Sequence, residues 1–319
     1  MNDFGSPLDL SFLDHDWQPI ARLVEVWLDT AVRTTTKIGE GFYGKIYRAS
    51  LAKDPYEVII KCYKYAGHAA QEATQLDILR PPALVKVPHI YASYTPSQFF
   101  PSEALLMEYL PGVIMSDELE FPSEKAQANF VESVVANLLA WHNCHHPHGF
   151  GQPQGPFHPT WPSYFGERIT LYHQHLHQEK HQAVVSEYVL SVAAQSYEAF
   201  PEIFAQTQAR PSLVHGDYNI FNMLVDPATH QLTGILDPLD AGWADYEIDL
   251  FHLANGRPEV GLLEHYLQQR PVEEPFWLRY HFYRFWDDIK HYVRMGYYEE
   301  TLFSHNARLL AGAMKKYLT

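Results

Sequence analysis

The first part of the chain changes from a helical to a strand-like spacing of its hydrophobic positions. Between about residues 15 and 29, apolar side chains recur every three to four positions, which is typical of an amphipathic helix. A second helix is predicted over 68–79, and it should stop before Pro81 and Pro82, because proline lacks the amide donor and clashes with the preceding turn. Short β-prone runs bounded by turn signals predict strands at 34–38, 45–51, 57–63, 87–94 and 104–109.

Beyond the turn signal Leu110-Pro111-Gly112 the pattern becomes mostly helical. A β-rich island at 212–236 interrupts it. The predicted helical stretches are 124–143, 163–206, 259–269, 274–295 and 299–318. The sequence therefore predicts an α+β protein with two domains, a smaller β-rich one over residues 1–110 and a larger, mainly helical one over 111–319.

Composition narrows the expected partners and compartment. The 38 acidic and 23 basic residues give a formal net charge of −15, which repels phosphate backbones and anionic headgroups and favours a cationic small molecule. Cys62 and Cys144 are too few for a disulfide framework. No run approaches the roughly 20 apolar residues of a membrane span, and the N-terminus lacks a signal-peptide pattern. We expect a cytoplasmic monomer or weak homodimer without nucleic-acid or membrane partners.

A glycine-rich string lies between the first two predicted strands. Gly39, Gly41 and Gly44 form a GxGxxG pattern that is followed by a strand and not by a helix, which disfavours a dinucleotide-binding Rossmann turn. In such a hairpin, glycines let the backbone lie close over the phosphates of a nucleotide. An ordinary glycine-rich hairpin is an equally open reading of this string alone.

Lys61 ends the apolar run Val58-Ile59-Ile60. A lysine at this place either extends its ammonium group into a cleft or snorkels at a strand end. In the kinase arrangement it pairs with nucleotide phosphates and with a helix glutamate, and Glu72 in the next predicted helix is the expected partner.

A third constellation consists of Asp217, Asn222 and Asp237. Phosphoryl transfer needs a carboxylate that orients the attacking hydroxyl and accepts its proton, and Asp217 suits that role. It also needs oxygen ligands that hold Mg²⁺ against the triphosphate, for which Asn222 and Asp237 are suited. Together with the glycine string and Lys61, this order of residues predicts an ATP- and Mg²⁺-dependent phosphotransferase.

These residues carry a family resemblance. His215–Asn222 is similar to the HGDxxxxN hallmark of the aminoglycoside phosphotransferase and fructosamine kinase superfamily, relatives of the protein kinases. Asp237–Leu250 resembles that family's acidic run ending in Asp-Leu, and Leu138–His142 its helix ending in Leu-x-x-Leu-His. Leu106–Tyr109 resembles the hinge that meets the adenine ring. The resemblance covers about residues 36–256.

The resemblance implies a two-lobed protein-kinase-like fold with Glu108 and Tyr109 at the nucleotide. It also implies that Asp249 tethers the backbone of the catalytic loop, and that His215 packs to support this loop. The sub-family stays open, because 161–168 is similar to fructosamine kinases whereas Tyr218-Asn219 departs from their Leu-Trp.

Two further groups of residues have competing interpretations. Histidines at 142–148 and at 173, 175 and 177 could bind a metal, but loop and surface histidines in contact with water are favoured. Asp287-Asp288 lies among aromatic residues and could hold an ammonium group, although a helix with core aromatics and solvated acids is the favoured reading.

The leading functional hypothesis is a kinase for the hydroxyl of a small metabolite, with a fructosamine-like or amine-bearing sugar as candidate acceptor. Alternatives are an aminoglycoside- or choline-type kinase and a non-catalytic nucleotide-binding regulator of the same fold. A protein kinase is disfavoured, because the twelve positions from Asp237 to Asp249 leave no room for an activation segment.

Overall fold

The computed structural model describes residues 5–14, 17–178, 181 and 183–318. The chain forms two compact units. The first unit comprises Met1–Met115 and Asn222–Leu239, and the second comprises Ser116–Phe221 and Asp240–Thr319.

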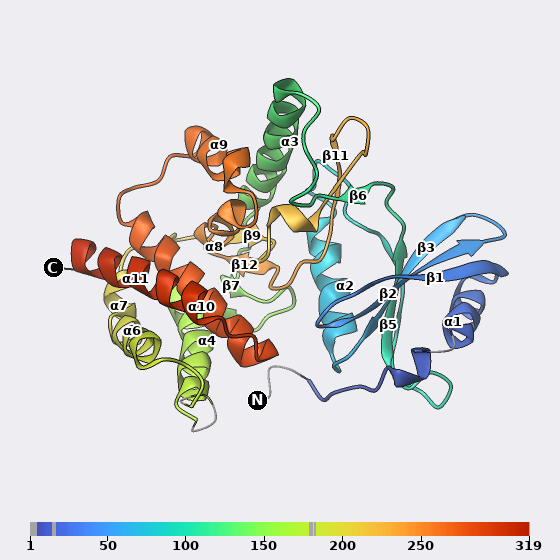
Figure 1. The fold of residues 1–319 in the computed structure, drawn as a ribbon, viewed down its shortest axis with the longest axis horizontal. Coiled ribbons are helices and arrows are strands. Elements are labelled where there is room, and N and C mark those ends of the chain that lie inside the picture. Colours follow the sequence, from blue (N-terminus) through green and yellow to red (C-terminus); the bar gives the residue numbers. More distant parts are fainter. Residues whose placement is uncertain (1–4, 15–16, 179–180, 182, 319) are drawn as a thin grey trace. The chain divides into compact units, whose positions relative to one another are not determined.

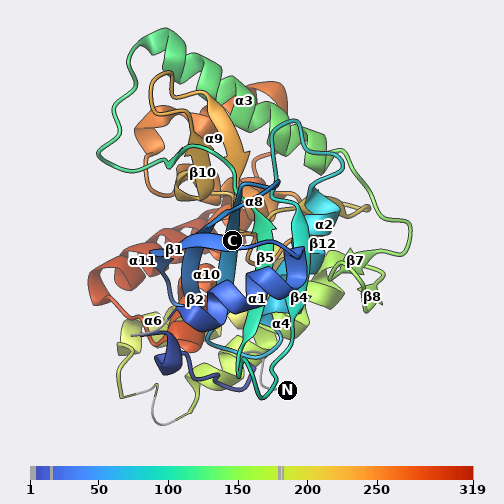
Figure 2. The ribbon, with the colours of Figure 1, turned by 90° about the vertical axis from the view of Figure 1, so that its right-hand side faces the viewer.

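The first unit is built on a five-stranded antiparallel sheet with the order β1-β2-β3-β5-β4. Its strands are β1 (Val32–Glu40), β2 (Gly44–Leu51), β3 (Glu57–Tyr63), β4 (Ile90–Tyr94) and β5 (Glu103–Glu108). Neighbouring strands along the chain pair directly, with the exception that β5 lies between β3 and β4. Figure 2 shows β5 beside β4. Short connections account for the β1–β2, β2–β3 and β4–β5 pairings, since antiparallel strands need little connecting chain. The chain between β3 and β4 is longer and contains the helix at 68–79.

The alternation of side chains along β3 defines two faces of this sheet. Val58, Ile60 and Cys62 belong to a core cluster with apolar residues of α1 (Gln18–Leu28). Ile59 and Tyr63 pack on the opposite face with residues of α2 (His68–Leu79). Figure 1 shows the two helices on opposite sides of the sheet. Lys61 lies two positions from both Ile59 and Tyr63 along β3, so its side chain is on the same face as theirs, the α2 face.

A second, three-stranded sheet completes the first unit. It joins β6 (Val113–Ile114), β10 (Met223–Val225) and β11 (Leu232–Ile235) in the order β11-β10-β6. The segment 222–239 lies within the region that the sequence assigned to the helical domain, yet it groups with the first unit. Backbone pairing between β10 and β6 accounts for this grouping. A single domain boundary near residue 110 stays a prediction.

The second unit is mainly helical, with one small sheet in the order β8-β7-β12-β9. Its strands are β7 (Phe150–Gly151), β8 (Phe157–His158), β9 (Ser212–Val214) and β12 (Gly242–Ala244). Its helices are α3 (Glu124–His142), α4 (Trp161–Leu176), α6 (Glu187–Glu198), α7 (Phe200–Ile203), α8 (Glu247–Leu250), α9 (Leu262–Gln269), α10 (Phe276–Met295) and α11 (Glu300–Tyr317).

Aromatic side chains form much of the core around α10. Phe282, Tyr283 and Trp286 of this helix are all buried. α10 ends at Gly296, whose φ of 71° is a left-handed conformation that favours glycine at a helix end. α11 then packs back along α10 (Figure 1). The predicted α+β fold class is confirmed.

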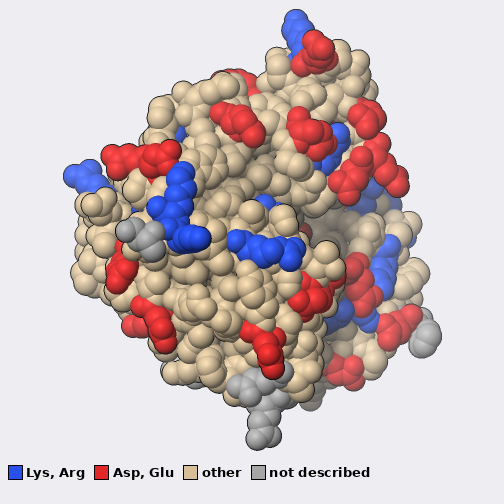
Figure 3. Space-filling model, turned by 60° about the vertical axis from the view of Figure 1, so that its left-hand side comes forward, with Lys and Arg blue, Asp and Glu red and all other residues tan. Residues whose placement is uncertain are grey.

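Charged groups are scattered among uncharged residues on the face that Figure 3 displays, without separating by sign. Acidic and basic side chains are interspersed there. Within the described residues, no helix combines the length and apolar character that a membrane crossing requires.

Candidate active site

The glycine string forms the turn of the β1–β2 hairpin in the first unit. The amide of Gly41 donates a hydrogen bond to the carbonyl oxygen of Gly44 over 2.9 Å. A Cβ on Gly44 would lie 2.2 Å from the carbonyl oxygen of Cys62, so close packing of β2 on β3 requires glycine there. A Cβ on Gly41 would meet nothing within 4 Å, and one on Gly39 would make only ordinary contacts with Ile46. Packing within the protein therefore explains Gly44 but not Gly41.

Lys64 contacts the same turn. Its Nζ donates to the carbonyl oxygen of Gly41 over 2.9 Å and lies 3.0 Å from Glu40. Hydrogen bonds from Lys37 and Lys64 lower the pKa of the Glu40 carboxyl to about 2. These exposed contacts tie one side of the turn to the end of β3.

Lys61 is the centre of a charge cluster on the α2 face. Its Nζ donates to Glu72 over 2.7 Å and to Asp237 over 2.8 Å. Burial lowers the pKa of Lys61, but the charges of Asp237 and Glu72 outweigh this effect and raise it. Burial raises the pKa of Glu72, which also accepts a hydrogen bond from the Tyr63 hydroxyl over 2.8 Å. The structure thus brings together three predicted site residues that are far apart in the sequence.

Asn222 and Asp237 flank the paired ends of β10 and β11. The amide of Leu236 donates to the carbonyl oxygen of Asn222 over 2.9 Å, so both residues emerge at the same end of this hairpin. Asp237 has a φ of 54°, which is uncommon for a residue with a Cβ and occurs often at functional sites. Its side chain is 48% exposed. A carboxylate and an amide oxygen are donors of the hard type that Mg²⁺ prefers.

Glu108 and Tyr109 lie at and just beyond the end of β5. The Glu108 carboxylate accepts from Lys86 Nζ over 3.4 Å and from the amide of His89 over 3.3 Å. The guanidinium carbon of Arg48 lies 4.2 Å from the centre of the Tyr109 ring. Glu108 lies opposite Val58 on the neighbouring strand, and Val58 is three positions before Lys61. These two residues are therefore not part of the Lys61 cluster.

Asp217 belongs to the second unit, where a buried carboxylate fixes its loop. Asp249 accepts from the backbone amides of His215 over 2.9 Å and Gly216 over 2.7 Å, which confirms the expected tether. Burial raises the pKa of Asp249, but His142 and the His215 amide outweigh burial and lower it. Gly216 has a φ of 76°, and a Cβ there would lie 2.7–2.9 Å from atoms of Asp240.

Asn219 and His252, both in the same unit, lie next to the Asp217 side chain. The amide nitrogen of the Asn219 side chain donates to Asp217 Oδ1 over 2.7 Å. Nδ1 of the buried His252 lies 3.5 Å from the same oxygen. The carboxylate is 25% exposed, so it stays accessible although its loop is rigidly held.

The histidine clusters and the Asp287-Asp288 pair differ in part from expectation. His142 is fully buried: its Nδ1 is 2.7 Å from the Tyr266 hydroxyl and its Nε2 is 3.2 Å from Asp249, so the interpretation of a solvated histidine was wrong for this residue. The aspartates are not solvated either, because Asp287 contacts Lys290 and the Asn306 side chain donates to Asp288 over 2.6 Å. Among the described residues, no group of three or more His, Cys, Asp or Glu could hold a metal.

Comparison with known families decides the class of protein. The family model described as "Phosphotransferase enzyme family" matches residues 34–282. The chain belongs to this family. The predicted class of enzyme, a phosphotransferase, is therefore confirmed.

Relatives and solved structures agree with this assignment at the level of fold. The phosphotransferase is 26% identical over 250 residues to "Uncharacterized protein YcbJ" of Escherichia coli K12, covering 78% of this chain and 83% of that protein. A proposed fructosamine-3-kinase from Thermobifida fusca superposes with a TM-score of 0.66 at 20% identity, covering 92% of this chain and 98% of that one. Aminoglycoside phosphotransferase APH(4)-Ia, bound to AMP-PNP and hygromycin B, gives a TM-score of 0.70 at 14% identity, covering 93% and 98%.

Sequence reasoning missed several residues beside the predicted ones. Lys64 follows directly on β3, but nothing in its spacing predicts contact with the glycine turn. His252 follows the recognised Asp-Leu pair by two positions, and a histidine there gives no signal of its own. Lys290 follows Asp287 at helical spacing, which could have predicted the ion pair between them.

Proposed function

We propose that this phosphotransferase moves the γ-phosphoryl group of ATP to a hydroxyl of a small molecule, with Asp217 as the catalytic carboxylate. The observation that carries the proposal is the pairing of the largely buried Lys61 ammonium group with both Glu72 and Asp237. An ammonium group held between a helix carboxylate and a second carboxylate is the arrangement that kinases use to bind nucleotide phosphates.

Each role in nucleotide binding is assigned to a residue of the first unit. Lys61 would contact the phosphates, and the open space at Gly41 would let the turn lie close to them. Gly39 and Gly44 shape the hairpin that carries this turn. Leu106–Tyr109 would face the adenine ring, as the family resemblance implies. That APH(4)-Ia binds AMP-PNP supports a nucleotide substrate for its structural neighbour here.

The donor chemistry of the first unit fits Mg²⁺. Asn222 and Asp237 offer an amide and a carboxylate oxygen at one end of the β10–β11 hairpin. Mg²⁺ commonly takes one or two carboxylates and completes its shell with water and substrate phosphate, so no larger protein cluster is required. When bound, the ion supplies charge neutralisation of the triphosphate.

The proposed reaction is a direct displacement at phosphorus. The acceptor oxygen forms a bond to the γ-phosphorus, while the bond from that phosphorus to the β–γ bridging oxygen breaks and its electrons stay on ADP. The proton of the acceptor hydroxyl passes to a carboxylate oxygen of Asp217. Asn219 and the backbone tether to Asp249 hold this carboxylate in a fixed orientation before the substrate arrives.

The test is a screen for ADP release. Purified protein with ATP and Mg²⁺ is incubated with pooled sugars, sugar acids, amino sugars, amino alcohols and glycated lysine. We expect acceptor-dependent ADP release from at least one pool. Asp217→Asn should lower its rate by about 10²–10⁴-fold, because the positioned proton acceptor is lost. Full turnover by this variant would refute the role of Asp217.

The same screen separates the alternatives. Binding of ATP with no turnover on any pool would favour a non-catalytic regulator. Preference for a cationic acceptor would favour an aminoglycoside- or choline-type kinase, in line with the hygromycin B held by APH(4)-Ia. Phosphorylation of a folded protein would instead indicate a protein kinase.

A further inference from the structure

The proposed reaction leaves His252, a buried neighbour of the Asp217 carboxylate, without a role. His252 is 2% exposed, and its Nδ1 lies 3.5 Å from Asp217 Oδ1. This ring nitrogen makes no well-formed hydrogen bond with a described residue. A buried polar atom without a partner costs free energy, so its place beside the carboxylate needs a cause.

The helical stretch that contains α8 directs two side chains at the catalytic loop. Asp249, in α8, accepts from the backbone amides of His215 and Gly216. His252 follows three positions later, at the start of the 3-10 turn 252–254, and residues three apart on a helix lie on the same face. This stretch therefore contacts the loop twice, at its backbone through Asp249 and at the proposed reacting side chain through His252.

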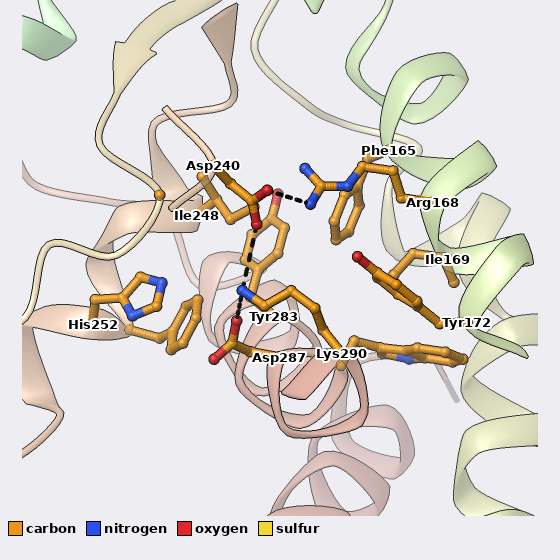
Figure 4. Close-up of a pocket in the computed structure, with 13 residues that line it drawn as sticks. Phe165, Arg168, Ile169, Tyr172, Asp240, Ile248, His252, Tyr283, Asp287 and Lys290 are labelled. Atoms are coloured by element: carbon orange, nitrogen blue, oxygen red, sulfur yellow. Dashed lines mark hydrogen bonds and ion pairs between the residues drawn. The ribbon is translucent and has the colours of Figure 1, made fainter. Parts of the chain in front are cut away.

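Close packing limits the movement of the His252 ring. The centre of the Phe251 ring lies 3.8 Å from the centre of the imidazole. His252 also lines a narrow cavity of about 30 Å³ in the second unit, which has room for little more than a water molecule. In Figure 4, His252 lies on the opposite side of this cavity from Arg168 and Tyr172 of α4. The imidazole is therefore held beside the catalytic loop by its surroundings.

Asp287 is a second carboxylate near His252, but other cations contact it directly. It forms an ion pair with Lys290, which Figure 4 marks, and its Oδ2 lies 3.2 Å from Nδ1 of His291. Burial raises the pKa of Asp287, but Lys290 and His291 outweigh burial and lower it, with a smaller contribution from the charge of His252. The carboxylate that Nδ1 of His252 faces at short distance is that of Asp217.

We propose that His252 is a positioning residue for the transfer and donates a proton on its Nδ1 to the Asp217 carboxylate. This inference rests on the proposed phosphoryl transfer. A bare Nδ1 would turn its lone pair toward a negatively charged oxygen, whereas an N–H forms a charge-assisted hydrogen bond with it. Asn219 donates to the same Oδ1 over 2.7 Å. Two donors from separate segments fix the orientation of the carboxylate, and we expect the 3.5 Å separation to shorten when substrates bind.

Nitrogen NMR of the protein labelled with ¹⁵N-histidine tests the position of the proton without ATP or an acceptor. The ring signals of His252 are assigned by their loss in His252→Asn. We expect a protonated Nδ1 in the wild type at neutral pH, because the hydrogen bond to Asp217 selects the nitrogen that carries the proton. Asp217→Ala removes the carboxylate and should change the Nδ1 signal. A bare Nδ1 in the wild type, or the same signal in both proteins, would overturn the proposal.

His252→Leu and His252→Asn test the role in transfer as a matched pair. Both new side chains branch at Cγ and leave a similar space, but only asparagine offers an N–H near the position of Nδ1. Single-turnover transfer from γ-labelled ATP is measured with an acceptor from the screen or, where no pool reacts, with water as the acceptor. We expect leucine to lower the rate about 10–100-fold with the ATP affinity within about threefold, and asparagine to restore most of the rate. Equal losses in both variants, or no loss in either, would contradict the proposal.

Circular dichroism checks the folding of these variants, and His265→Leu is the control. His265 contacts Glu132 and Gln269, so its replacement should leave the transfer rate unchanged. Failure of this inference and failure of the proposed function give different results. A full transfer rate in Asp217→Asn would contradict the proposed function and with it the role of His252. A large loss in Asp217→Asn without any loss in His252→Leu would support the function and overturn the positioning role.

Discussion

The Lys61 cluster of the first unit and the Asp217 loop of the second unit differ in how their charged side chains are held in position. In the first, Lys61, Glu72 and Asp237 hold one another directly through their side chains. In the second, the carboxylate proposed to react is held indirectly. Asp249 binds the backbone of the loop, and Asp217 projects from that backbone.

In the second unit, Asp249 fixes the loop and a different residue, Asp217, is proposed to react. In the first unit, Lys61 is proposed to do both. Lys61 both stabilises buried Glu72 and is proposed to bind phosphate, so its replacement should affect the fold and the site together. Asp217 is one-quarter exposed, whereas Asp249 is fully buried. Replacing Asp217 should therefore impair chemistry alone, and replacing Asp249 should impair the fold first.

The largest expected loss of stability follows Asp249→Asn. An amide cannot accept from both backbone amides and pair with His142, so buried donors lose their partner. We expect the free energy of unfolding in urea to fall by about 2–5 kcal/mol. Folding lowers the pKa of Asp249, so its contribution should be present above about pH 4 and lost as the pH falls through the folded pKa. A variant as stable as the wild type would show that the tether is dispensable.

Lys61→Met should have the next largest effect, because it leaves the buried Glu72 carboxylate without its cation. We expect a loss of about 2–4 kcal/mol in the free energy of unfolding, together with weaker binding of ATP. The double variant Lys61→Met/Glu72→Gln should recover part of the stability but none of the binding. If the single and double variants are equally stable, the unpaired charge of Glu72 is not the cause of the loss.

Gly44→Ala and Gly41→Ala sharpen the comparison inside the first unit. The added Cβ at 44 would lie 2.2 Å from the Cys62 carbonyl, and we expect a loss of about 1–3 kcal/mol in thermal unfolding. At 41 the Cβ meets open space, so stability should stay within about 0.5 kcal/mol while the affinity for ATP falls. Equal stability losses would mean that the turn is not built as described.

The smallest effect on stability should follow Asp217→Asn. The new amide keeps an oxygen that can accept from Asn219, and the carboxylate that it replaces is 25% exposed. We expect the free energy of unfolding to change by less than about 1 kcal/mol in chemical denaturation. A loss comparable to that of Asp249→Asn would show that Asp217 also holds the loop.

Local patterns predicted most of the fold. The helix at 68–79 agrees with α2 residue for residue, because its period and the following prolines are both local signals. The β6, β7, β8 and β12 strands were not predicted, since two or three residues are too few to show a period of their own. The grouping of 222–239 with the first unit depends on pairing with β6, more than 100 residues earlier in the chain.

The sequence predicted the residues of the candidate site better than their surroundings. The contact of Lys61 with Asp237 spans 176 positions, and the order of the motifs was enough to expect both at one site. Contacts of Asp240 with Arg168 and Lys290 were not predicted. Charges on separate elements, here two helices and the segment between β11 and β12, give no periodic signal, and only the packing of these elements brings them together.

Single-turnover transfer from γ-labelled ATP by Asp217→Asn tests the central claim most directly. The measurement is made at saturating ATP and Mg²⁺ with an acceptor found in the screen, next to the ATP affinity of the same variant. We predict an affinity within about threefold of the wild type and a transfer rate lower by about 10²–10⁴-fold. A transfer rate equal to that of the wild type would contradict the assignment of Asp217 as the catalytic carboxylate.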